Sequence, residues 1–458
     1  MFRESLKYML LTLLIAGLII CGCVWLSRSA AAKKAAAAEL AAATPAPTET
    51  PEPTAEPTPT PTSAPTPEPT AEPTPSPTPT PALTAAEMKL MPYVQSLSVE
   101  EKLGQMVMFG LTGVQKADAQ YEELFRKYHV GNVLLLSNNI YNDARDGGFS
   151  NAKKLIDSLQ ASNESEIPLL FSVDAEGGTV TRFTWRPGLK APQALGDSGK
   201  PELAHDQFLR VGQKLRTTGI GLDLAPVLDV AKAPNKTFLK TRIISKDADV
   251  TSTIGTTIID ALHEGGCLAT AKHFPGHGGT TMDSHSAMPI VTSSEEEMRA
   301  YDLVPFAAAI DAGVDAVMVA HIKYNQLDRG NVATLSYTII TELLREELGF
   351  DGIVISDDFR MDGIARQYQP GDAAVRFVLA GGDMILCGPD TDRQTAIMEG
   401  LLDAVKDGTL TEERIDLSVC RILARKELVK DPEPVLAPDG TAVTPDPALT
   451  PAPIVPNR

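Results

Sequence analysis

Short apolar runs recur through the middle of the chain, and the stretches between them carry apolar residues at helical spacing. Between residues 100 and 390 the runs are MVMF (106–109), NVLLL (132–136), LLFSV (169–173), LDLAPV (222–227), LATAK (268–272), AVMVA (316–320), IVIS (353–356) and MILC (384–387). They are nearly continuous rather than alternating in polarity, which is typical of strands buried on both faces. The pattern therefore predicts eight strands of a parallel sheet.

The stretches between these runs include NAKKLIDSLQ, LAHDQFLRVGQKLRTTG and SYTIITELLREELG, which suit amphipathic helices covering a sheet. The last of them is expected to end at Leu348, with Gly349 as its C-terminal cap. Eight β-α repeats favour an α/β fold of the TIM-like (β/α)8 barrel type, as a single catalytic domain. An open, doubly wound sheet is the alternative.

The two ends of the chain have compositions that a folded core does not use. The apolar run Tyr8–Leu26 has about the length of a membrane span, and a Pro/Thr-rich stretch after it should stay solvated. We therefore expect four parts: a membrane anchor or signal segment (1–34), an Ala- then Pro/Thr-rich linker (35–82), the barrel (83–430) and a Pro-rich tail (431–458).

This arrangement predicts a domain held outside the cell and tethered to the cell membrane through its N-terminal segment. A cleaved signal peptide, giving a secreted protein, and a lipoprotein modified at Cys23 are the alternatives. The formal net charge of −18 argues against a nucleic-acid partner. Cys267, Cys387 and Cys420 give no disulfide framework or metal spacing, and the first two are expected in the core.

Polar residues follow four of the predicted strands directly. Asp174 follows LLFSV, His273 follows LATAK, His321 follows AVMVA and Asp357 follows IVIS. A single polar residue at a strand end is usually an ordinary loop residue. In a parallel barrel, however, all these ends open onto one rim, where the active site lies. The sequence therefore predicts a polar site at this rim.

The stretch SDDFRMDG places two adjacent carboxylates, Asp357 and Asp358, at the end of a strand. In an extended chain they point to opposite sides, so one can face the barrel mouth while the other contacts a neighbour. An ionised carboxylate at the mouth can attack the anomeric carbon of a sugar. The alternative is that the pair caps the following helix.

The stretch KHFPGHGGTTMDSH holds a lysine, three histidines and an aspartate among glycines. Histidine can transfer a proton in either direction near neutral pH, and Asp283 stands two residues from His285. The pair therefore suits an acid/base device on a flexible loop.

A zinc site on His273, His277 and His285 is the alternative for this stretch. It is disfavoured because Pro275 and Gly276 break the helix on which an HxxxH pair would bind metal. Phosphate-loop and GxSxG motifs are absent from the sequence, so neither a nucleotide site nor a serine hydrolase is predicted. No metal and no cofactor are expected.

The stretch VDAEGGTVTR follows the third predicted strand and contains Asp174 and Arg182. A carboxylate can accept two hydrogen bonds from sugar hydroxyls, and an arginine supplies complementary donors. A simple Asp–Arg pair at the surface is the alternative.

These three motifs, with ATLSYTIITELLREELGFDGIVISDDFRMDGI and AGGDMILC, resemble family 3 glycoside hydrolases, specifically the β-N-acetylglucosaminidase branch, from about Ser98 to Arg425. The resemblance implies a TIM-like barrel without a cofactor. It implies that Asp357 is the nucleophile and that His285, oriented by Asp283, is the acid/base. The substrate contacts that it implies are Asp174, Arg182, Arg242, Lys272 and His273.

The chain departs from the family pattern at several positions. Gly279 stands in GHGGT where the family usually has GHGDT, Ile243 and Ile244 follow Arg242 in place of Ser-Phe, and Thr179 and Thr181 replace the usual Arg and Gln. The family's usual substrates are peptidoglycan fragments or chitin-type oligosaccharides that contain N-acetylglucosamine. A β-glycosidase of other sugar specificity, a phosphorylase and a non-catalytic wall-binding protein are the alternatives.

Overall fold

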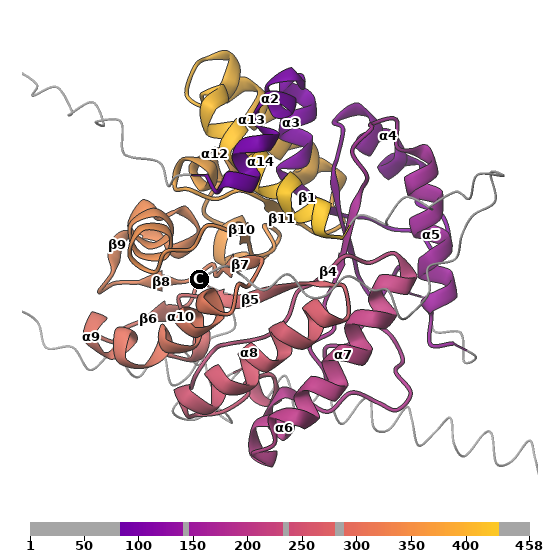
Figure 1. Cartoon of the computed structure of the whole chain (residues 1–458). Coiled ribbons are helices and arrows are strands. Elements are labelled where there is room, and N and C mark those ends of the chain that lie inside the picture. The colour runs from indigo at the N-terminus through magenta and orange to yellow at the C-terminus, as the bar shows by residue number, and fades with distance from the viewer. Residues whose placement is uncertain (1–82, 141–145, 232–237, 280–287, 430–458) are drawn as a thin grey trace, which may run out of the picture. The chain divides into compact units, whose positions relative to one another are not determined.

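The eight apolar runs form eight parallel strands, which make the centre of the fold (Figure 1). The computed structural model describes residues 83–140, 146–231, 238–279 and 288–429. The strands are β1 (Val107–Gly110), β2 (Asn132–Leu135), β3 (Leu170–Val173), β4 (Leu222–Asp223), β5 (Leu268–Phe274), β7 (Ala316–Val319), β10 (Ile353–Ser356) and β11 (Ile385–Cys387). Their order in the sheet is β10-β7-β5-β4-β3-β2-β1-β11.

The two strands at the ends of this order also meet each other. A parallel bridge links Ile355 in β10 to Met384 beside β11, and the Ser356 N–H donates a hydrogen bond to the Met384 carbonyl at 3.0 Å. The sheet is therefore a nearly closed barrel. This confirms the predicted TIM-like fold, and the open doubly wound alternative is wrong.

All residues of the eight barrel strands are buried. One face of each strand meets the barrel interior, where Ser172 Oγ of β3 lies 3.0 Å from Met108 Sδ of β1. The other face packs against the surrounding helices. Because both faces are buried, the strands appear in the sequence as continuous apolar runs.

Helices surround the barrel on its outside (Figure 1). The longer ones are α2 (Ala85–Ser96), α3 (Val99–Gln105), α4 (Ala119–Lys127), α5 (Phe149–Ser162), α6 (Pro192–Ser198), α7 (Pro201–Thr218), α8 (Ala248–Glu264), α10 (Val304–Asp311), η6 (Thr338–Glu347), α12 (Pro370–Leu379), α13 (Thr391–Lys406) and α14 (Glu412–Leu428). The short ones are η2 (Lys240–Arg242), η3 (His277–Gly279), α9 (Glu295–Glu297), η4 (Met298–Asp302), η5 (Ala333–Leu335) and α11 (Asp362–Ala365).

The three helical stretches named from the sequence all form helices. NAKKLIDSLQ lies in α5, LAHDQFLRVGQKLRTT lies in α7, and most of SYTIITELLREELG forms η6, which is a π-helix. Gly349 follows the end of η6 with a φ of 72°, the left-handed conformation of a C-terminal cap. The predicted helix end is therefore confirmed.

A small second sheet, which the sequence pattern did not reveal, is inserted after β5 and after β7. It contains β6 (Ile290–Val291), β8 (Lys323–Tyr324) and β9 (Asp328–Val332), with β6 parallel and β9 antiparallel to β8. The buried Tyr324 hydroxyl donates a hydrogen bond to the Gly276 carbonyl at 2.9 Å. This bond ties the small sheet to the loop that follows β5.

Several sequence predictions concern residues outside the described part of the chain. These are the anchor or signal segment (1–34), the linker (35–82) and the tail (431–458). Within residues 83–429, apart from the undescribed gaps, no helix combines the length and apolarity needed to cross a bilayer. Cys267 and Cys387 are buried with free thiols, as predicted, and so is Cys420.

His263 and Asp315 form an ion pair near the amino-terminal end of β7. His263 Nε2, in the last turn of α8, lies 2.7 Å from Asp315 Oδ2, which also accepts a hydrogen bond from the Ala269 N–H at 2.9 Å. Partial burial disfavours the imidazolium, but the hydrogen bond and charge of Asp315 outweigh it and raise the pKa of His263. A cation here also complements the C-terminal dipole of α8.

This pair makes part of the stability depend on pH. Because the folded-state pKa of His263 is raised, the stabilisation is fully present below the unfolded value of about 6.5 and is lost as pH rises through the folded value. We expect His263→Gln to lower the free energy of unfolding by about 0.5–1 kcal/mol at about pH 5.5, and by less at about pH 9. Urea unfolding at both values measures the difference. An equal loss at the two pH values would contradict the role given to the imidazolium.

Candidate active site

The carboxyl ends of the barrel strands enclose a hollow of about 410 Å³. Among the residues that line it are six that were expected from the sequence: Asp174, Arg182, Arg242, Lys272, His273 and Asp357. The other two expected residues, Asp283 and His285, lie outside the described part of the chain. The structure thus brings these six residues together from distant parts of the sequence. Their parts in catalysis and substrate binding stay predictions.

Asp174 directly follows β3 and bridges two cations. Its Oδ1 accepts a hydrogen bond from Lys272 Nζ at 2.8 Å, and its Oδ2 accepts one from Arg182 Nη2 at 2.6 Å. Burial by itself would raise the pKa of Asp174, but the charges of Lys272 and Arg182 lower it below its usual range. The carboxylate is therefore ionised, and its pairing with Arg182 belongs to the hollow rather than to an ordinary surface pair.

Glu176 lies two residues further along the same loop and is almost completely buried. Its carboxylate accepts hydrogen bonds from Arg242 Nε at 2.7 Å and Arg242 Nη2 at 2.9 Å, and forms an ion pair with Lys272 Nζ at 2.6 Å. Burial raises the pKa of Glu176, but the Lys272 and Arg242 charges outweigh it and lower the pKa. A buried carboxylate that is fully paired in this way holds its partners in place.

Arg242 reaches Glu176 from the end of the short helix η2. Ile243 and Ile244, which follow it in place of the family's usual Ser-Phe, are both fully buried. They anchor the chain immediately after the arginine. The departure from the family pattern is therefore compatible with Arg242 at the hollow.

Lys272 and His273 lie within β5, which continues to Phe274. The sequence had placed the end of this strand at Lys272, so the position of His273 after the strand is corrected. The register of β5 against β7 shifts between Lys272 and Phe274, so one extra residue is accommodated there. Such a bulge re-aims side chains. It explains how two successive residues of one strand both line the hollow.

Asp229 orients His273 from behind the hollow. It is fully buried, and its Oδ2 lies 2.7 Å from His273 Nδ1, while its Oδ1 accepts from the backbone N–H groups of His273 at 3.2 Å and His277 at 2.6 Å. A carboxylate accepts hydrogen bonds, so the proton sits on His273 Nδ1. His273 Nε2, the other ring nitrogen, lies 3.5 Å from Arg242 Nη2.

His277 begins the short helix η3, and its ring also lines the hollow. The ring lies edge-on to Phe238, with centroids 4.6 Å apart, and 5.9 Å from the ring of His273. Burial disfavours its charged form more than Asp229 favours it, which lowers the pKa of His277 to about 4. At neutral pH the His277 ring is therefore uncharged.

Asp357 and Asp358 follow β10 and have different surroundings. Asp357 lines the hollow, and its Oδ1 accepts a hydrogen bond from the Asp358 N–H at 2.8 Å. The Asp358 carboxylate is held by Arg360 Nη2 at 2.6 Å and by the Gly388 N–H at 3.1 Å. The first helix after them, α11, has Met361 at its N-cap position, so neither aspartate caps it. The helix-capping alternative is therefore wrong.

His321, the fourth polar residue expected at a strand end, is not part of the hollow's lining. It is fully buried, its Nδ1 lies 2.7 Å from Thr334 Oγ1, and its Nε2 lies 3.2 Å from the Asp358 carbonyl oxygen. Burial lowers the pKa of His321 despite the nearby carboxylates of Asp357 and Asp358. His321 therefore contacts the backbone of Asp358 from a buried position outside the lining of the hollow.

The rest of the lining is mostly apolar, which suits a ligand with both hydroxyl groups and C–H faces. It includes Leu134, Leu136, Val180, Leu224, Phe238, Met318, Met361 and Leu386. Among the described residues, no group of three or more His, Cys, Asp or Glu side chains is arranged to hold a metal ion. The chemistry available from the described residues is that of carboxylates, cations and imidazoles.

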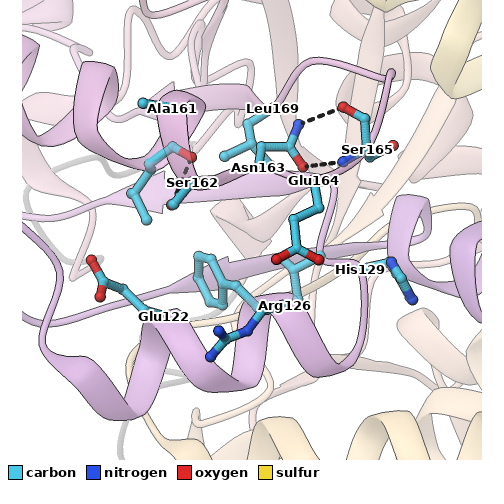
Figure 2. Close-up of a pocket in the computed structure, with 12 residues that line it drawn as sticks. Glu122, Arg126, His129, Ala161, Ser162, Asn163, Glu164, Ser165 and Leu169 are labelled. Atoms are coloured by element: carbon cyan, nitrogen blue, oxygen red, sulfur yellow. Dashed lines mark hydrogen bonds between the residues drawn. The ribbon is translucent and has the colours of Figure 1, made fainter.

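A second hollow, of about 320 Å³, is lined by residues of α4, the end of α5 and the chain segments that precede β2 and β3 (Figure 2). It therefore lies toward the amino-terminal ends of these strands, away from the candidate active site. Arg126, His129 and Glu164 are exposed there. The Asn163 side-chain amide donates a hydrogen bond to the Ser165 carbonyl and accepts one from the Ser165 N–H. This hollow has the features of a surface groove between helices.

Comparison with known proteins identifies the family. A family model described as the glycosyl hydrolase family 3 N terminal domain matches residues 98–424. The chain belongs to this family. The resemblance recognised from the motifs is therefore confirmed.

Individual members of family 3 resemble the chain over much of its length. A beta-hexosaminidase of Tolumonas auensis is 37% identical over 62% of this chain and 83% of its own length. Beta-hexosaminidase A of Pseudoalteromonas piscicida is 32% identical over 67% of this chain. A family 3 beta-N-acetylglucosaminidase structure from Paenibacillus sp. is similar with a TM-score of 0.70 and 37% identity over 76% of this chain. The chain spans 55% of the Pseudoalteromonas protein and 66% of the Paenibacillus chain.

Two buried acids of the site, Glu176 and Asp229, were not singled out from the sequence. Glu176 stands in the quoted motif VDAEGGTVTR, two residues after Asp174, so its position was a usable signal. Asp229 follows the fourth apolar run by two residues, but nothing in the pattern links it to His273, which is far away in the sequence. Only the folded barrel pairs them.

We expect Asp229→Asn to lower kcat/KM about 10–100-fold on an aryl N-acetyl-β-glucosaminide, the substrate type suggested by the relatives' names. An amide cannot accept on both sides, so either His273 Nδ1–H or the two backbone N–H groups lose their acceptor. Steady-state kinetics measure the loss, and a thermal melt reports whether the variant is folded.

Asp197→Asn is the matched control, because Asp197 is an exposed carboxylate on α6. It should leave kcat/KM unchanged. A folded Asp229→Asn protein with the kcat/KM of the Asp197→Asn control would show that the orientation of His273 does not matter.

Proposed function

We propose that the chain is a retaining, exo-acting β-N-acetylglucosaminidase that releases terminal β-linked N-acetylglucosamine from peptidoglycan fragments or chitin-type oligosaccharides. Family membership and the names of the similar proteins support a β-hexosaminidase activity. The observation that carries the proposal is that the carboxylate of Asp357 lines the same hollow as Asp174, Lys272 and His273. A nucleophile and a set of hydroxyl-binding groups thus share one sugar-sized space.

Asp174, Arg182, Lys272 and His273 would bind the hydroxyl groups of the terminal sugar. Their own ion pairs hold them in place before substrate arrives, with side chains between 3% and 28% exposed. Groups held in this way need little rearrangement on binding, which favours the transition state. The N–H groups of Arg182 and Lys272 would donate, and the Asp174 carboxylate would accept.

In the first chemical step, an Asp357 carboxylate oxygen would form a bond to the anomeric carbon while the bond from that carbon to the leaving oxygen breaks. His285, oriented by Asp283, would give its proton to the leaving oxygen. In the second step the same histidine would take a proton from water, and the water oxygen would displace Asp357 from the anomeric carbon. Two displacements retain the anomeric configuration. General acid–base catalysis of this kind contributes roughly 10²–10⁴-fold.

Support for the roles of Asp283 and His285 comes from the described residues on either side of them. His277 stands eight residues before His285 and lines the hollow, and a Cβ placed on Gly279 would lie 3.1 Å from Val291 Cγ1, so described residues before and after this stretch lie close together. An extended chain spans about 3.5 Å per residue, which gives His285 ample reach to a sugar at Asp357.

The proposal is tested by assaying the wild-type protein and Asp357→Ala against a panel of aryl β-glycosides. The wild type should prefer the N-acetylglucosaminide, and Asp357→Ala should lose at least about 10³-fold in kcat, because the carboxylate that forms the covalent intermediate is removed. Near-wild-type turnover by Asp357→Ala would contradict the proposal that Asp357 is the nucleophile. Sugar 1-phosphate among the products in phosphate buffer would show a phosphorylase instead.

Aryl glycosides of one sugar that differ in their leaving group test the acid role of His285 separately from the nucleophile. His285→Gln should lose about 10²-fold or more on substrates with poor leaving groups and much less on those with very good leaving groups, which need little protonation. Rates are compared across a series of phenols with different pKa values. Equal losses across this series would contradict the acid role of His285.

A further inference from the structure

Asp223 is a buried acid of the barrel that the proposed mechanism does not use. It ends the short strand β4, and its backbone pairs with Val173 in β3 and with Ala269 in β5. The residue has no exposed surface. It therefore lies between the two strands that lead to Asp174 and to Lys272.

The carboxyl group of Asp223 supports the loop after β3. Its Oδ1 accepts a hydrogen bond from the Ala175 N–H at 2.9 Å. Ala175 is fully buried and stands between Asp174 and Glu176 in the sequence. These two acids hold Lys272 Nζ at 2.8 and 2.6 Å. One hydrogen bond to Asp223 thus fixes the piece of backbone that carries both acids.

Asp223 has fewer partners than the other buried acids close to the hollow. Each of those acids pairs with a lysine, arginine or histidine side chain, as Asp174, Glu176 and Asp229 do. Within the described part of the chain, Asp223 Oδ2 has no hydrogen-bond partner. Burial without a paired cation costs far more for an ionised carboxylate than for a carboxylic acid. The geometry therefore favours a proton on Asp223.

The charged groups around Asp223 act on it in opposite directions. Burial has the largest effect and raises the pKa of Asp223, and the carboxylates of Asp174 and Glu176 raise it further. The backbone hydrogen bond and the Lys272 ammonium lower it, and the resulting pKa is about 8. The Cys267 thiol, directly before β5, also interacts with Asp223, but burial raises the pKa of that thiol and keeps it uncharged.

We propose that Asp223 is a positioning residue that works only in its protonated form, and that its ionisation disables the sugar-binding loop after β3. Ionisation would add a buried negative charge that repels Asp174 and Glu176 and competes with them for Lys272. The loop and the ammonium would then lose the arrangement described above. The kinetic part of this inference rests on the function proposed above, whereas the protonation state of Asp223 can be tested without any substrate.

The kinetic test uses an aryl N-acetyl-β-glucosaminide with a very good leaving group, so that protonation by His285 contributes little. For the wild type, kcat/KM should fall about tenfold between about pH 7 and about pH 9, because the protonated fraction of Asp223 falls by this factor. In Asp223→Asn the change should be less than about twofold, because an amide stays uncharged and its oxygen can still accept from the Ala175 N–H. Each ratio is taken within one protein, so a general loss of activity cancels.

Thermal unfolding tests the protonation state of Asp223 directly. Its folded-state pKa is raised above the ordinary 3.8, so the unfolded chain releases this proton at lower pH than the folded protein does. The wild type therefore loses stability as pH rises from about 4 to about 8, and Asp223→Asn has no proton to lose at this position. The Tm of Asp223→Asn minus that of the wild type should increase by about 3–6 °C between about pH 6 and about pH 8.

Asp223→Val tests the hydrogen bond to the loop, because valine suits a strand but accepts no hydrogen bond. At about pH 7 this variant should raise KM about tenfold and change kcat less, since the buried Ala175 N–H loses its acceptor while Asp357 is untouched. A thermal melt shows that the variant is folded. A folded Asp223→Val protein with the KM of the wild type would overturn the positioning role.

Asp197→Asn is the matched control for the pH measurements, since Asp197 is an exposed carboxylate, and it should follow the wild type in both. The same pH ratio of kcat/KM in the wild type and Asp223→Asn would overturn the effect of ionisation on the site. A Tm difference that stays constant or shrinks between the two pH values would show that Asp223 is ionised in the folded protein, and would also overturn the proposal. Failure of the wild type to hydrolyse the N-acetylglucosaminide would instead overturn the proposed function.

Discussion

The ammonium group of Lys272 is buried between the carboxylates of Asp174 and Glu176, and the side of the hollow formed by β5 and the loop after β3 depends on this contact. Its Nζ lies 2.8 Å from Asp174 and 2.6 Å from Glu176, and the side chain is 3% exposed. Burial alone lowers the pKa of Lys272, but the two carboxylates outweigh it and raise the pKa. Removing one partner of such a buried group typically costs about 3–5 kcal/mol, because the other charges are left uncompensated. The network therefore holds parts of β5, η2 and the loop after β3 in one arrangement.

The opposite side of the hollow is organised in a similar way around one adjacent pair of acids. Asp358 is held by Arg360 and Gly388, and its backbone carbonyl lies against the buried His321. Both residues line the hollow, and the Asp358 side chain, which is paired with Arg360, also fixes the loop. In the mechanism proposed above, a carboxylate positioned by its neighbour would lose little freedom when substrate binds, which would lower the entropic part of the barrier.

Much of this fold follows from the sequence pattern alone. Strands buried on both faces produce continuous apolar runs, and each of the eight runs in this sequence corresponds to one barrel strand, because both faces of every strand are covered in a parallel barrel. The convergence of Asp174, His273 and Asp357 followed from the same rule. The small sheet of β6, β8 and β9 was not foreseen, because its strands are short and partly exposed and carry no such run.

The finer features of the site depend on contacts that no local pattern contains. The bulge in β5 is set by the pairing of β5 with β7, so the inward position of both Lys272 and His273 was not deducible from their alternation. Glu176 and Asp229 are buried acids whose partners, Arg242 and His273, lie far away along the chain. The ionisation of these two carboxylates is determined by their tertiary partners rather than by their neighbours in sequence.

Trapping the covalent intermediate tests most directly whether Asp357 attacks a sugar held by the Lys272 network. A fluorinated N-acetylglucosaminyl fluoride that forms the intermediate readily but hydrolyses slowly would be incubated with the protein, which is then digested and examined by mass spectrometry. The expected result is one sugar attached to the peptide that contains Asp357, and no such adduct in Asp357→Ala. A sugar attached to a different residue, or turnover of this substrate with no adduct at any stage, would contradict the proposed mechanism.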